Sequence, residues 1–196
     1  MINRRFTFLK AGIDQVKEAI LSRYKTSQLN YEVCYAPLTF QFKKRISFRA
    51  SETELILWQP ENACGTAMFG NLQDGFDTLG YNINRCFHIE LTRISLSLED
   101  ETGEFNYAPF YKFQHFYPDG RERYVRVMWD NRWEFWEKGE PMAFEQTEKY
   151  NERIRRKRLT NDMVLDYVKA LGWDLRDPRF WTSQRDACFI KTMMNK

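Results

Sequence analysis

A cysteine followed by a glycine is the residue pair best suited to covalent chemistry. Cys64 precedes Gly65 in a segment typical of a loop, and His88 or His115 could serve as the base that activates its thiol. The residues around Cys64, however, match no local signature of a cysteine protease. A cysteine-dependent hydrolase or transferase therefore stays an alternative, and a buried or incidental thiol is the default interpretation. We assign no catalytic residue.

The sequence carries no recognisable metal or cofactor motif. Its cysteines, Cys34, Cys64, Cys86 and Cys188, are too widely spaced for a neighbouring pair to clasp zinc. Glycines recur every five residues over 65–80, a pattern that matches neither the P-loop nor the dinucleotide-binding fingerprint. We predict free thiols, no metal and no cofactor.

A run of basic residues is the strongest charge feature. Basic side chains beside aromatic residues can hold a nucleic-acid backbone, so nucleic-acid binding is an alternative function. The preceding glutamates predict instead a helix from about Glu145 to Lys157, with its acids and bases complementing the helix dipole. A solvated helix face is the favoured interpretation. The basic residues are Arg153, Arg155, Arg156, Lys157 and Arg158.

The segment 110–136 has the clearest strand pattern. Aromatic residues alternate along it, and turn residues at 118–120 and 130–131 divide it into three antiparallel strands. Large side chains occur on both faces of these strands. Either helices cover both faces, or one face stays partly open to a partner.

Strand alternation predicts the composition of such an open face. Arg132, Glu134 and Trp136 share one face of the third strand, opposite Trp133 and Phe135. Tryptophan and arginine concentrate at the centres of protein interfaces. We therefore predict a partner-binding surface formed by Trp136 as anchor with Arg126, Arg132 and Glu134.

The remaining patterns predict helices and strands on both sides of this meander. Apolar spacing indicates helices over about 13–24, from Asp74 to Cys86, from Thr160 to Leu171, and a short one at 178–181. Strands are expected over 38–48, 55–58 and 89–98. In the last, the change of phase near Arg93 indicates either a bulge or two strands that meet there.

Size and composition favour one α+β domain over residues 1–196. Its expected sheet is mainly antiparallel or mixed, with an N-terminal helix, a middle helix and a C-terminal helical segment. The net charge of +3 is balanced and singles out no partner. No run of about 18 uncharged apolar residues occurs, so we expect no membrane partner and a cytoplasmic location. The oligomeric state stays open.

Several stretches together resemble uncharacterised bacterial proteins, some of which are similar to immunity proteins of polymorphic toxin systems. The resemblance implies a protein that binds a cognate toxin, blocks its active site and needs no catalytic residues. Because immunity proteins against nucleases are often acidic, the mildly basic charge argues against a nuclease target. A non-enzymatic protein-binding module is the first prediction. The stretches are 70–76, 122–126, 132–135, 137–139 and 144–145.

Overall fold

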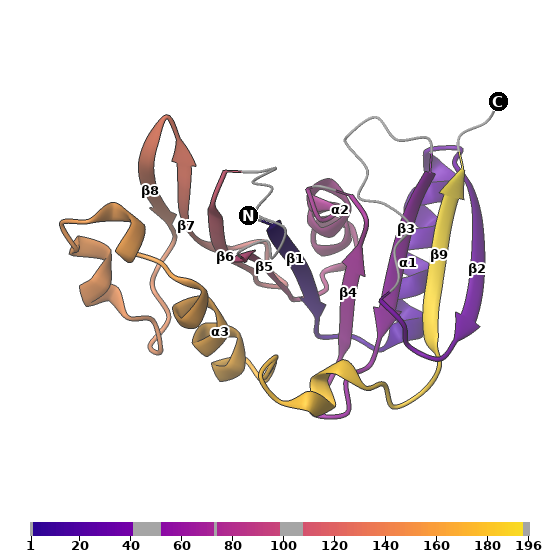
Figure 1. Ribbon diagram of the computed structural model, residues 1–196. Coiled ribbons are helices and arrows are strands. Elements are labelled where there is room, and N and C mark those ends of the chain that lie inside the picture. The colour runs from indigo at the N-terminus through magenta and orange to yellow at the C-terminus, as the bar shows by residue number, and fades with distance from the viewer. Residues whose placement is uncertain (1, 41–51, 73, 99–107, 194–196) are drawn as a thin grey trace.

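A single antiparallel sheet forms the centre of the computed structural model, which describes residues 2–40, 52–72, 74–98 and 108–193 (Figure 1). The described residues form nine strands in the order β2-β9-β3-β4-β1-β5-β6-β7-β8, and all neighbours are antiparallel. The prediction of an α+β fold with a mainly antiparallel sheet is confirmed. The strands are β1 (Ile2–Leu9), β2 (Asn30–Ala36), β3 (Glu52–Trp58), β4 (Thr66–Gly70), β5 (Leu91–Leu98), β6 (Phe110–Phe116), β7 (Glu122–Asp130), β8 (Arg132–Lys138) and β9 (Ala187–Met193).

Helices cover both faces of this sheet. The α1/α2-side core joins α1 (Ile13–Thr26) and α2 (Asp77–Phe87) to one face, and the α3-side core joins α3 (Asn161–Ala170) to the other (Figure 1). Neighbouring residues of β1 illustrate the division, since Phe8 belongs to the α3-side core and Leu9 to the α1/α2-side core. Three short 3₁₀ helices lie in the C-terminal third: η1 (Thr147–Asn151), η2 (Arg155–Lys157) and η3 (Pro178–Trp181).

The helix signals at 13–24 and 160–171 correspond to α1 and α3. The α1 stripe of Ile13, Val16, Ile20 and Tyr24 is buried. The Thr160 hydroxyl accepts a hydrogen bond from the Met163 backbone N–H at 3.3 Å, as expected of an N-cap. The sequence pattern therefore located both helices.

The three strands predicted within 110–136 are β6, β7 and β8. Both alternatives considered near Arg93, a bulge and a junction of two strands, are wrong, because β5 is one strand that pairs with β1 in continuous register from Leu91 to Leu98. Leu91 lies on the α1/α2 side and Ile94 and Leu96 on the α3 side. Since both faces of β5 are covered, its apolar residues can point to either face and need not occupy every second position.

The helix predicted from Glu145 to Lys157 is also wrong. The chain forms η1 and η2 instead, and Glu152 between them has an extended backbone with ψ 137. Leu38 and Phe40 lie outside the strands, although both pack against the α3-side core. The rest of the strand expected over 38–48, residues 41–48, lies outside the described residues.

Candidate functional site

An arginine and two aromatic rings form a partly exposed cluster on β7 and β8. Arg126 is directly opposite Trp136 in the strand register, and its guanidinium carbon lies 5.6 Å from the centroid of the Trp136 ring. Tyr124 packs edge-on against the same indole at 5.0 Å. The Trp136 side chain nevertheless remains 41 % exposed. We call Tyr124, Arg126, Arg132, Glu134 and Trp136 the β7–β8 patch.

The β7–β8 patch lies on the α1/α2 side of the sheet but outside the core that those two helices form. The core that they form contains no residue of β7 or β8. Arg132 and Glu134 share this face, where their side chains approach to 3.5 Å. The structure thus brings all four predicted binding residues onto one face, and their role in binding stays a prediction.

Arg126 lacks a counter-ion in the described part of the chain. No described carboxylate lies within ion-pair distance of its guanidinium. Its Nε is buried and donates to no acceptor there. Burying such a donor is unfavourable unless another group satisfies it.

Beside this patch, on the same face of the sheet, two further cations lie beneath α2. Arg93 and Lys112 are almost fully buried, and both pair with Asp77 in the first turn of α2. Burial lowers the pKa of Arg93 to about 9 and the pKa of Lys112 well below its usual value. Gly80 of α2 passes directly over Arg93, because a β-carbon there would lie 3.4 Å from the arginine side chain. This cluster fixes α2 to β5 and β6.

The basic run is exposed, but part of it is held against β8. Arg155 donates to the Trp133 carbonyl oxygen at 3.2 Å, and Arg158 lies 5.4 Å from the Phe135 ring centroid. Arg158 also donates to the Glu152 carbonyl at 2.8 Å. Arg153, Arg156 and Lys157 face solvent. The run therefore partly stabilises its own loop against the sheet.

A buried carboxylate that sequence reasoning placed on a helix surface lies nearby. Glu145 accepts hydrogen bonds from Arg123 at 2.7 and 2.9 Å, from the Tyr150 hydroxyl at 2.7 Å and from the Met142 backbone N–H at 2.9 Å. Arg123 and the Glu145 side chain are essentially inaccessible to solvent. This network attaches the segment after β8 to the sheet, which explains why no regular helix starts at Glu145.

The geometry does not support Cys64 as a nucleophile activated by a described histidine. Cys64 is exposed and free, but no contact joins it to a described histidine. His115 lies on β6, three strands from β4, which is about 14 Å at the usual strand spacing. Burial lowers the pKa of His115 to about 4, so its ring is a weak base. His88 is exposed after α2, where its Nδ1 lies 3.2 Å from the Pro118 carbonyl.

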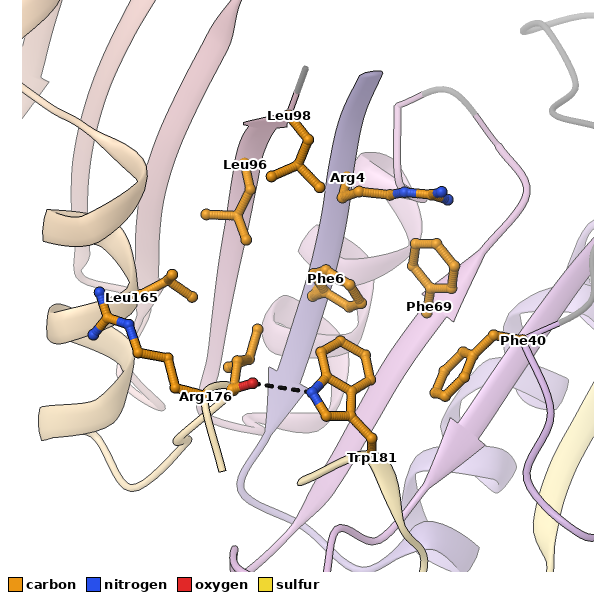
Figure 2. Close-up of a pocket in the computed structure, with 10 residues that line it drawn as sticks. Arg4, Phe6, Phe40, Phe69, Leu96, Leu98, Leu165, Arg176 and Trp181 are labelled. Atoms are coloured by element: carbon orange, nitrogen blue, oxygen red, sulfur yellow. Dashed lines mark hydrogen bonds between the residues drawn. The ribbon is translucent and has the colours of Figure 1, made fainter. Parts of the chain in front are cut away.

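A second candidate site is a cavity of about 450 Å³ on the opposite side of the sheet, which we call the α3-side pocket. Eight of the ten described residues that line it are apolar. Figure 2 shows Arg4 beside Phe6 and Phe69, away from Arg176 and Trp181. No local sequence pattern signals this pocket, since its walls come from β1, β4, β5, α3, the loop after α3, η3 and the segment before residue 41.

No protein-family model, curated protein or solved structure matches the chain. None of the helices in the described ranges has both the length and the hydropathy that crossing a membrane requires. In those same ranges, no three histidine, cysteine or acidic side chains converge as metal ligands would.

Proposed function

We propose that this protein is a non-enzymatic binding module that uses the β7–β8 patch to hold a partner protein. The observation that carries the proposal is the pairing of a 41 % exposed Trp136 with Arg126, a cation without a described counter-ion. Tryptophan and arginine dominate the energetic centres of interfaces. A partner carboxylate placed beside the Arg126 guanidinium would supply the counter-ion that no described residue provides.

The most concrete form of this proposal is an immunity protein that neutralises a cognate bacterial toxin in the cytoplasm. The resemblance of residues 122–126 and 132–135 supports it, because both stretches lie on the strands that carry the patch. The four cysteines are free thiols, as is usual in the cytosol. Gene neighbourhood provides a first check: a toxin gene directly adjacent supports this role, and an isolated gene among metabolic enzymes argues against it.

The decisive experiment measures the affinity of the chain for the product of that adjacent gene. Trp136→Ala should weaken binding by about 2 kcal/mol or more, as expected of an interface hot spot. The thermal midpoint of the free protein should change little, because the indole lies outside both cores.

Trp129→Ala is the matched control. Trp129 lies on the same hairpin with nearly the same exposure, 42 %, but on the opposite face, against Trp133. Equal losses of affinity in the two variants would contradict the assignment of binding to the patch. A large loss of stability in Trp136→Ala would assign this residue to the fold instead.

A further inference from the structure

The α3-side pocket is open and apolar, and neither the fold nor the proposed partner surface accounts for it. Leu98 and Trp181 at its edge are among the exposed large hydrophobic residues of the chain. Its volume of about 450 Å³ lies within the range of roughly 300–1,000 Å³ typical of small-molecule sites. It lies on the opposite face of the sheet from the β7–β8 patch.

The polar atoms of the pocket wall are engaged, with one exception. The Trp181 Nε1 donates to the Leu175 carbonyl at 3.0 Å (Figure 2). Arg176 directs its guanidinium to Asp166 at 2.6 Å and Asp162 at 2.9 Å, so that only its aliphatic stem serves the pocket.

Arg4 is the exception. Its side chain extends from β1 on the same face as Phe6, opposite Leu96, and no described carboxylate forms an ion pair with it. An apolar cavity that has, at one end, a guanidinium without a described counter-ion is complementary to an apolar molecule that carries one anionic group.

The aromatic walls favour a flexible apolar body over a flat one. The Trp181 ring is tilted by 71° to Phe6 and by 77° to Phe40, and Phe40 is tilted by 64° to Phe69. Phe6 and Phe69 are the exception, since they stack on each other at 4.9 Å and 23°. Because these two faces are already in contact and the other rings meet edge to face, no open pair of parallel faces is left for a flat ligand to stack between. An alkyl chain can follow such irregular walls.

We infer that the α3-side pocket binds a carboxylate with a long alkyl tail, of the fatty-acid class. The tail occupies the space between Phe6, Phe69, Leu96 and Trp181, and the carboxylate accepts hydrogen bonds from the Arg4 guanidinium. This ligand site is independent of the proposed protein-binding function.

Calorimetric titration of the full chain with dodecanoate, kept below its micelle concentration, tests the inference. We expect saturable binding of one molecule per chain. Arg4→Gln should weaken dodecanoate binding by about tenfold or more, because a charge-assisted hydrogen bond is lost. Dodecanol, which has the same tail but no charge, should bind wild type and Arg4→Gln alike. Arg121→Gln, in the turn between β6 and β7 and paired with Asp119, is the matched control.

A second variant tests the same inference independently, in case Arg4→Gln does not fold. Leu98→Asp places a carboxylate at the exposed edge of the pocket, beside Arg4, and should also weaken dodecanoate binding. Thermal midpoints establish that each variant is folded. Absence of dodecanoate binding to wild type overturns the inference. Equal binding of dodecanoate to wild type, Arg4→Gln and Leu98→Asp, or several molecules bound per chain in all of them, overturns it as well.

Discussion

His115 is a buried titratable residue whose chemistry is set by its neighbours. Its Nδ1 lies 2.8 Å from the Thr92 hydroxyl, its Nε2 lies 3.5 Å from Glu90, and its ring packs against Tyr117 at 4.6 Å. Burial lowers its pKa from 6.5 to about 4, and Glu90 opposes this effect only in part. The folded protein therefore holds His115 neutral in the range where an unfolded chain protonates it.

This difference predicts a loss of stability in acid. Between pH 6.5 and about 4 the unfolded state binds a proton that the folded state excludes, so the free energy of unfolding falls as the pH falls. Above pH 6.5 the residue makes no such contribution. His115→Gln should remove this part of the pH dependence, so its urea-unfolding midpoint should decline less steeply than that of wild type. Parallel curves for the two proteins would contradict the burial of a neutral His115.

One carboxylate links α2 to two buried cations of the sheet, in addition to the apolar contacts of that helix. Asp77 pairs with both Arg93 and Lys112, which are buried. Asp77→Asn would leave two buried cations without their counter-ion. We expect a loss of about 3 kcal/mol in the free energy of unfolding, at the lower end for a broken buried pair because the Asp77 side chain is 43 % exposed.

Asp162→Asn provides a matched control in the first turn of α3. The Asp162 side chain is 86 % exposed and pairs with the half-exposed Arg176, so its loss should cost less than about 1 kcal/mol. Chemical denaturation of both variants measures the difference. Equal losses would show that helix-dipole effects, which both aspartates share, outweigh the buried cluster.

The accuracy of sequence reasoning differed between elements for physical reasons. The meander β6–β8 was predicted because turn residues separate its alternating strands, and α3 because Thr160 caps a periodic stripe. β1 was missed because Arg4 and Arg5 interrupt its apolar character, although Arg5 lies beside the Phe110 ring, with 5.1 Å between guanidinium carbon and centroid. β9 pairs with β2 and β3, contacts too distant along the chain for local patterns to reveal.

For the candidate sites too, features with a local sequence signal were predicted and features that depend on distant contacts were not. Strand alternation placed Arg132, Glu134 and Trp136 on one face, because the period of a strand is local. It did not reveal that the α1/α2-side core contains no residue of β7 or β8, which decides whether that face is open. The α3-side pocket could not be predicted either, since Arg4 and Trp181 meet only through the folded sheet.

In the whole molecule, both cores share the central strands. β1, β3, β4, β5 and β6 contribute residues to the α3-side core and to the α1/α2-side core. The strand order also interleaves the chain, because β9 lies between β2 and β3, and β1 lies between β4 and β5. Neither layer can therefore separate from the other without breaking the same sheet.

This arrangement predicts that a substitution that destabilises the core on one side of the sheet lowers the unfolding midpoint of both layers by the same amount. Ile190→Ala removes a fully buried β9 side chain from the α1/α2-side core and should cost about 2–5 kcal/mol. Trp58 and Trp173, both in the α3-side core, report on the opposite layer through their fluorescence. Urea unfolding followed by this fluorescence and by far-ultraviolet circular dichroism should shift to lower midpoints by the same amount in the variant, and the two transitions should coincide. A circular dichroism transition that moves while the fluorescence transition stays in place would show that the two layers unfold independently.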